Sequence, residues 1–325
     1  MKHKILILSS YILLCATLSA QAIDRQHNIQ LHIGGGLGTM LYDATDAQTQ
    51  LGFGGVAGLQ YQLMFNHNIG IGVGVEANML NSAATYNKLT TLSNVTHPDN
   101  GELYDHTTNF MEWKERQQAI VLGIPIQLMI RVPMNEQWVF QSGIGAAFNM
   151  PVSATYRHAE GAYKTTGYFP STNVTYEDLP NHGFTTVKGV EDASFNMLNY
   201  FSALLDLGVV MNLSENAGLY MGVYGSYGFT NVVDNDAACN HLVDPVEGYK
   251  GTFNSDRVEE AFPLSAGVKI GIRLGAGKNV DWKQIEAAEK AAAEAAEAAR
   301  LEKERLEAEA RAKAEAEARA QAQAD

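Results

Sequence analysis

Six ionisable side chains are the residues whose types could carry chemistry. Each falls on the small or polar side of a segment in which apolar residues occupy every second position: His32, Glu76, Arg131, Asp206, Lys269 and Arg273. Gln60, Gln127, Gln141 and Asn212 share that side. Because an isolated buried charge is costly, we expect Asp206 and Glu76 to face Lys269, Arg273 or Arg131. Such a network either conducts ions or protons, or serves as a structural polar filling.

Histidines in the polar stretches are the second candidate group. They are His97, His106, His158, His182 and His241, with many Ser and Asp residues nearby. Neither a nucleophile nor a metal-ligand spacing links them, and a site would need two or three to converge in space. The "IGGGLG" at Gly34 lacks the following helix of a dinucleotide-binding loop. The sequence therefore predicts no catalytic residue, cofactor or metal.

The elements that carry the six side chains have the two-residue period of β-strands. Alternation over about ten residues is the length that a tilted strand needs to cross a bilayer. Eight segments qualify: 28–40, 51–65, 68–80, 117–131, 138–150, 200–213, 218–230 and 262–275. Pro125 cannot donate a ladder hydrogen bond, so a bulge or bend is expected there.

The connections alternate between short and long, as in outer-membrane barrels. Short links lie at 66–68, 132–137 and 214–217, and long ones at 41–50, 81–115, 151–199 and 231–261. Aromatic residues are expected on the outward face where it meets the two bilayer interfaces. On the short-turn side these are Tyr61, Phe65, Trp138 and Phe140, and on the long-loop side Phe148, Phe201, Tyr227, Phe229 and Phe262.

Strands of a soluble sandwich or lipocalin-like barrel also alternate apolar and polar residues, but their polar face is rich in charged residues. Here the second face is largely glycine, which suits the crowded interior of a narrow barrel. We therefore predict an all-β fold over residues 23–276, an eight-stranded antiparallel transmembrane β-barrel. Its interior is just wide enough for side chains, so the ionisable residues are expected to be a structural filling.

The two ends differ in composition from the barrel. Lys2 and Lys4 precede an apolar stretch that ends in small residues, which predicts a signal peptide over residues 1–22. Residues 277–325 are almost wholly Ala, Glu, Lys, Arg and Gln after the Gly-rich "LGAGKNV", which predicts a charged α-helical tail. An even strand number places both ends in the periplasm. There the tail is a solvated spacer, or it self-associates weakly or binds a periplasmic partner.

Net charge and loop composition limit the classes of molecule that the protein could bind. The net charge of −13 argues against nucleic acid, which requires clustered Lys and Arg. The second and third long loops carry tyrosines and asparagines, which form adaptable contact surfaces. Binding of an extracellular ligand and simple steric shielding both fit these loops.

The segments "LGIPIQLMI", "QSGIGAAFNM", "ALLDLGVVMNL" and "GVYGSYGFTNV" resemble strands of the OmpA-like and OmpX-like outer-membrane barrels. The resemblance covers residues 23–276 and implies contact with outer-membrane lipid and insertion by the barrel assembly machinery. It also implies a non-enzymatic role in envelope integrity or adhesion. A helical tail takes the place of the OmpA-type peptidoglycan-binding domain, so direct cell-wall anchoring is not expected. The alternatives are a narrow channel and a surface lipid-modifying enzyme.

Overall fold

The computed structural model describes residues 26–276 except 67, 99, 215, 237, 239 and 240, together with scattered positions between 287 and 305. The chain divides at residue 277 into two compact units. The predicted signal peptide lies outside the described residues. No continuous helix is described beyond residue 277, so the helical tail stays a prediction.

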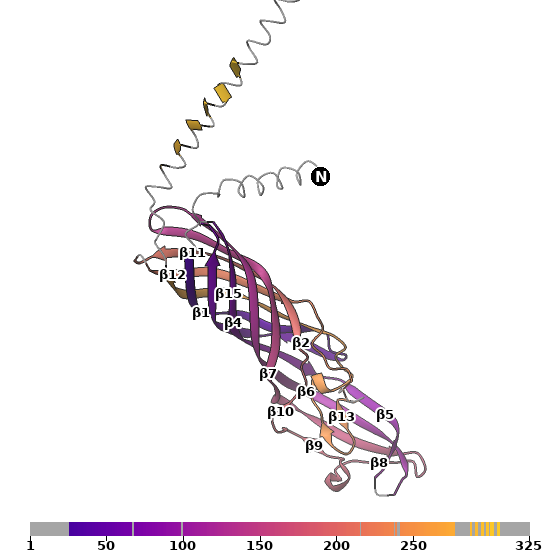
Figure 1. Cartoon of the computed structure of the whole chain (residues 1–325). Helices are drawn as coiled ribbons and strands as arrows, with labels where there is room; N and C mark the ends of the chain where they lie inside the picture. The colour runs from indigo at the N-terminus through magenta and orange to yellow at the C-terminus, as the bar shows by residue number, and fades with distance from the viewer. Residues whose placement is uncertain are drawn as a thin grey trace, which may run out of the picture. The chain divides into compact units, whose positions relative to one another are not determined.

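Eight strands form a closed antiparallel barrel (Figure 1). They are β1 (Gln26–Tyr42), β3 (Phe53–Met64), β4 (Ile69–Tyr86), β6 (Leu103–Pro133), β7 (Trp138–Phe169), β11 (Tyr200–Asn212), β12 (Ala217–Gly228) and β15 (Ala261–Ala276). Each pairs with the next, and β1 closes the barrel by pairing with β15 from His27–Ala276 to Tyr42–Ala261. All eight predicted strand segments are therefore confirmed.

The prediction of a bulge at Pro125 is wrong. Pairing of β4 with β6 stops at Val73–Ile126 and resumes at Glu76–Gly123 in an unchanged register. On the other side Pro125 pairs in register with Ala147 of β7. The missing N–H thus interrupts one ladder without adding a residue to the strand.

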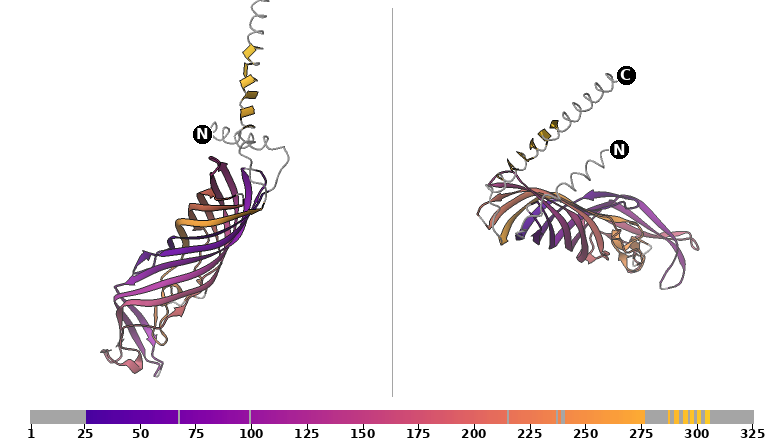
Figure 2. Two further views of the ribbon diagram at one scale, coloured as in Figure 1. Left: turned by 90° about the vertical axis from the view of Figure 1, so that its left-hand side faces the viewer. Right: turned by 45° about the horizontal axis from the view of Figure 1, so that its top comes forward.

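Two strands are much longer than predicted. β6 and β7 remain paired from Pro133–Val139 near their short turn to Asp105–Tyr168 far outside the barrel wall. Figures 1 and 2 show this hairpin continuing past the ends of the other barrel strands. We call its outer part, residues 103–118 and 153–169, the stalk. The prediction that residues 81–115 and 151–199 are loops throughout is therefore wrong.

A bulge in the stalk reverses which residues face inward. Glu112 has φ 52° and Gly161 on the facing strand has φ 88°, and the register shifts beside them. An ideal Cβ on Gly161 would lie 2.1 Å from the Glu112 carbonyl oxygen, so only glycine fits. Buried residues of β6 are even-numbered before Glu112 and odd-numbered after it. One extra residue therefore changes the face of every side chain beyond it.

Shorter elements pack on the stalk and the barrel rim. β2 (Ala47–Leu51) pairs with β4, β5 (Leu89–Thr96) with β6, and β8 (Val174–Tyr176), β9 (Thr186–Val187) and β10 (Ala193–Ser194) with β7. β13 (Val243–Asp244) and β14 (Gly248–Tyr249) form a separate pair, and the 3-10 turns are η1 (Pro180–His182) and η2 (Thr252–Asn254). Together they enclose an aromatic core that includes Tyr86, Trp113, Tyr163, Tyr249 and Phe253. The region beyond the barrel is a folded structure with its own core.

Candidate functional site

The barrel lumen contains a charged cluster built around Lys269. Its Nζ lies 2.9 Å from Asp206 Oδ1 and 3.4 Å from Glu76 Oε1. His32 Nε2 lies 2.8 Å from the same Glu76 oxygen. The Tyr224 ring covers Lys269 at 5.1 Å, a cation–π distance. Of the three predicted cations, it is thus the lysine that contacts both carboxylates.

Amide side chains extend this cluster across the lumen. Gln127 donates to Asp206 Oδ2 at 2.6 Å, and Gln60 donates to Gln127 at 2.6 Å. One hydrogen-bonded chain therefore joins six barrel strands through His32, Glu76, Lys269, Asp206, Gln127 and Gln60. Because each link comes from a different strand, the chain spans the lumen.

The two arginines lie nearer the short turns and bind amides. Arg131 donates to Gln62 at 2.5 Å and to Gln141 at 3.2 Å, and both glutamines hydrogen-bond Gln30. Arg273 donates to Asn212 at 2.8 Å. Within the described chain, neither arginine makes an ion pair with a predicted lumenal carboxylate. The guanidinium donors are instead satisfied by neutral amide oxygens.

Glycine on the inward face makes room for these long side chains. At Gly58, an ideal Cβ would lie 2.6 Å from Glu76 Cγ and 2.8 Å from His32 Nε2. Even an alanine there would collide with the charged cluster, since real Cβ atoms do not approach so closely. The glycine-rich face thus permits the polar filling.

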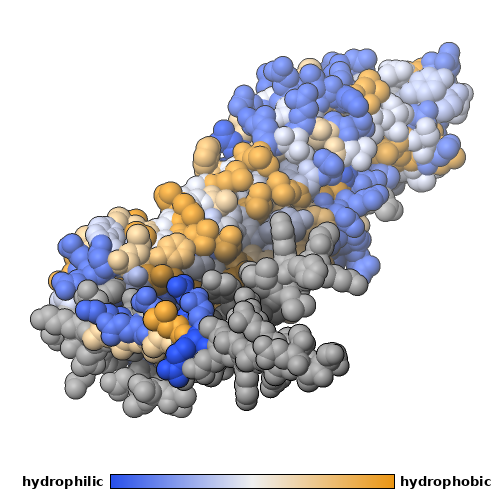
Figure 3. All heavy atoms as spheres, turned by 90° about the horizontal axis from the view of Figure 1, so that it is seen from above, coloured by the Kyte–Doolittle hydropathy of each residue, from blue (hydrophilic) through white to orange (hydrophobic). Residues whose placement is uncertain are grey.

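The outward face is a nearly continuous apolar surface. Large exposed residues occupy alternate positions on all eight strands, and Ile33 and Val268, for example, are 58% and 64% exposed. Figure 3 shows apolar residues gathered across the middle of the visible face, with hydrophilic residues toward the stalk. An exposed apolar patch of this extent marks a surface that contacts something other than water.

All nine predicted interface aromatics lie on this outward face, exposed or half-buried. On the long-loop side the Phe201 ring lies 5.2 Å from Phe148 and 6.5 Å from Phe229. Tyr227 and Phe262 stack at 6.4 Å on the same side. On the short-turn side the Tyr61 hydroxyl lies 2.5 Å from His27 Nδ1. Aromatic side chains on the long-loop side therefore contact one another across neighbouring strands.

Glu115 in the stalk is a buried acid that sequence analysis missed. Its carboxylate accepts hydrogen bonds from the Tyr249 hydroxyl at 2.6 Å, Gln117 at 2.6 Å and the Thr252 N–H at 3.0 Å. It is fully buried. Burial raises the pKa of Glu115, and the donated hydrogen bonds lower it in part. This cluster fastens the segment containing β14 and η2 to β6, and only recognition of the stalk as strand would have revealed it.

The loop histidines occupy three different surroundings. His97 Nε2 lies 3.3 Å from His182 Nδ1 near the stalk tip. His158 stacks on Trp113 at 4.1 Å between ring centroids. Burial lowers the pKa of His106 to about 4. In the described part of the chain, no group of three or more His, Cys, Asp or Glu side chains is placed to hold a metal ion.

No family model and no curated protein matches the chain. Similar solved structures include Neisserial surface protein A (9% identity, 77% of this chain and 95% of that chain, TM-score 0.31). The outer membrane protein OprG of Pseudomonas aeruginosa shares 12% identity over 78% of this chain and 96% of its own, with a TM-score of 0.34. A major outer membrane protein of Thermus thermophilus shares 13% identity over 77% and 99%, with a TM-score of 0.32.

The architecture is the one predicted from the sequence, an eight-stranded antiparallel barrel. Strand pairing within the chain itself carries this conclusion, since eight antiparallel strands close into one barrel. No helix among the described residues is long and apolar enough to span a membrane.

Proposed function

We propose that the chain is a non-enzymatic outer-membrane protein whose barrel supports a folded extracellular region with a role in envelope integrity or adhesion. One observation carries the proposal: a closed barrel exposes apolar side chains on alternate positions, while its interior holds the charged cluster of Lys269, Asp206 and Glu76 and the amides bonded to it. This inside-out arrangement is stable in a bilayer, because lipid contacts the apolar face and the closed sheet leaves no unpaired edge.

Trp138 provides a test of lipid contact. It lies on the outward face near the short turns, whereas Trp113 is fully buried in the aromatic core. In vesicles with brominated acyl chains, we expect fluorescence quenching in a variant that keeps only Trp138 and little in one that keeps only Trp113. A wild-type protein that stays monomeric in water without detergent, with Trp138 unquenched in vesicles, would contradict the proposal.

The stalk favours a binding role over simple shielding. Shielding needs only polar loops, whereas this region is a paired sheet with an aromatic core that fixes its surface. A fixed surface contacts a ligand at a lower entropic cost than a mobile one. The exposed stalk region is therefore suited to hold an extracellular partner.

Orientation is tested by labelling introduced cysteines on intact cells in a Cys239→Ser background. We expect a membrane-impermeant maleimide to label Asp178→Cys, which lies beyond the stalk. It should label Asn135→Cys, in a short turn, only after the outer membrane is permeabilised. The opposite pattern would place the stalk in the periplasm.

The tail is proposed to be periplasmic and to act as a solvated spacer or a weak self-association segment. Its composition of Ala, Glu, Lys and Arg supports an extended charged helix. Pull-down of periplasmic proteins with the whole chain and with a chain lacking residues 281–325 tests whether it binds a partner.

A further inference from the structure

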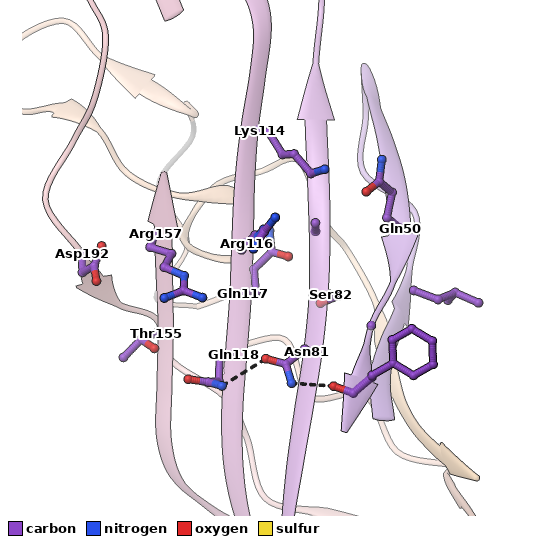
Figure 4. A pocket seen from close by; sticks show the side chains of 14 residues that line it. Gln50, Asn81, Ser82, Lys114, Arg116, Gln117, Gln118, Thr155, Arg157 and Asp192 are labelled. Atoms are coloured by element: carbon purple, nitrogen blue, oxygen red, sulfur yellow. Dashed lines mark hydrogen bonds between the residues drawn. The ribbon is translucent and has the colours of Figure 1, made fainter. Parts of the chain in front are cut away.

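A basic pocket lies on the outer surface where the stalk leaves the barrel. Its volume is about 430 Å³, and residues of strands β2, β3, β4, β6 and β7 line it. Lys114, Arg116 and Arg157 line it (Figure 4). We call these three residues the basic cluster.

Two members of the basic cluster are directly opposed like charges. Arg116 of β6 pairs in register with Arg157 of β7, and both side chains are exposed. Neither makes an ion pair or side-chain hydrogen bond with another described residue; Asp192 lines the pocket too, but no ion pair joins it to them. Among the described residues, the ion-pair partner of Lys114 is Glu160, at 3.9 Å. Like charges at opposed positions destabilise a sheet, so this arrangement fits an anion that binds both guanidinium groups.

The basic cluster stands directly above the apolar outward surface. Two residues along β6 from Arg116 lies Gln118, which donates to Asn81 on β4 at 3.1 Å, and Asn81 donates to the Phe53 carbonyl at 2.7 Å. Two residues further is Ile120, 44% exposed, at the edge of the apolar surface. At roughly 3.3 Å per residue, Arg116 is about 13 Å along the strand from Ile120. Cations at this level match the headgroups of a bilayer whose acyl chains reach Ile120.

Apolar side chains continue from the pocket into that surface. Phe53 lines the pocket and is 81% exposed, and Val152 on β7 is 69% exposed. A free anion would gain nothing from contact with these apolar side chains, whereas a lipid would contact them with its acyl chains.

We propose that the basic cluster binds the phosphate of a phosphorylated membrane lipid in the leaflet on the stalk side, with the acyl chains lying along Phe53, Ile120 and Val152. The assignment rests on the proposed membrane location. Two arginine forks bind one phosphate group in several directions at once, while Lys114 adds a third positive charge.

Native mass spectrometry of the detergent-purified full chain tests the assignment with three probes: diphosphorylated lipid A, the same glycolipid without its phosphates, and inorganic phosphate. We expect the wild type to bind the diphosphorylated lipid at least about tenfold more tightly than the other two. The double variant Arg116→Gln/Arg157→Gln should lose that preference. The charge-matched control, Lys290→Gln/Arg300→Gln in the second unit, should bind like the wild type.

Arg157→Glu separates binding from folding. It places a carboxylate opposite Arg116, so the lipid-free protein should melt at the same or a higher temperature while lipid binding is lost. Unchanged lipid binding in this variant, equal binding of the dephosphorylated lipid, or equally tight binding of inorganic phosphate would each overturn the assignment. Failure of the wild type to insert into vesicles would instead count against the proposed function.

Discussion

Lys269 compensates two carboxylates with a single positive charge. Asp206 and Glu76 contact it in the lumen at 2.9 and 3.4 Å. Removing one partner of a buried ion pair leaves an uncompensated charge. Loss of Lys269 would take the ion-pair partner from Asp206 and would leave Glu76 in contact with His32. The barrel should depend on this residue more than on either lumenal arginine.

We expect Lys269→Met to lower the free energy of unfolding by about 3–5 kcal/mol. Urea unfolding in detergent micelles, followed by tryptophan fluorescence, measures the change. Arg273→Met is the matched control: it removes a cation that hydrogen-bonds the neutral Asn212, so the loss should be smaller, about 1–3 kcal/mol. Equal losses would show that the carboxylates do not need the lysine.

Glu115 should make the stability of the stalk depend on pH. Burial raises the pKa of Glu115 from its ordinary value of 4.5. In the interval between that value and the raised one, the folded chain holds a proton that the unfolded chain has released. Its contribution to stability is therefore complete below the unfolded pKa and is lost as pH rises through the folded pKa.

Glu115→Gln should abolish this part of the pH dependence, because an amide does not titrate. Melting temperatures between about pH 4 and about pH 8 provide the measurement. Glu160→Gln changes the same charge at a side chain that is 66% exposed and should keep the wild-type slope. If Glu115→Gln kept the wild-type dependence of melting temperature on pH, Glu115 would not be the group that causes it.

At the residue scale, the face of the strand on which a side chain lies could be predicted, and the residues that it contacts could not. Alternation placed Glu76, Asp206 and Lys269 on one face because a strand has a two-residue period. The choice of lysine over the arginines depends on the stagger between strands, which no single segment encodes. Glu115 was missed because its neighbours were interpreted as loop.

At the scale of elements, the bulge at Glu112 and Gly161 determines how the stalk is built. With φ 88° and a Cβ position 2.1 Å from the Glu112 carbonyl, Gly161 tolerates no side chain without a shift of the backbone. The strand pairs beyond the bulge depend on that local geometry.

Gly161→Ala should therefore destabilise the outer stalk by about 1–3 kcal/mol. Amide hydrogen exchange should accelerate over 103–111 and 162–169 and stay unchanged in the barrel strands. Gly101→Ala is the control, since Gly101 also has a positive φ (72°) but its Cβ position contacts nothing within 4 Å. Uniform acceleration through the barrel would mean that stalk and barrel unfold together.

The eight barrel strands could be predicted because aliphatic and aromatic residues alternate along them with small or polar ones. The stalk could not, for two reasons. Its inward face mixes Tyr104, His106, Thr108 and Phe110, so hydrophobicity does not alternate clearly. The bulge then shifts the phase by one residue, which breaks the alternation over a longer window.

At the scale of the whole barrel, a filled lumen should not conduct ions. The hydrogen-bonded chain from His32 to Gln60 crosses the interior through six strands. We expect no steady openings of the wild-type protein in planar bilayers. Steady openings that Asp206→Asn alters would show instead that ions pass along the charged cluster.

The continuation of β6 and β7 from the barrel wall into the stalk has a mechanical consequence. A pull on the far tip is transmitted along the strand axes into the barrel wall, where β4 and β11 flank the hairpin. Hydrogen bonds between antiparallel strands run perpendicular to that direction, so the load shears many of them together and does not peel them apart singly. Such a hairpin, held in the barrel wall on both sides, should resist tension that would extend an unpaired segment of chain.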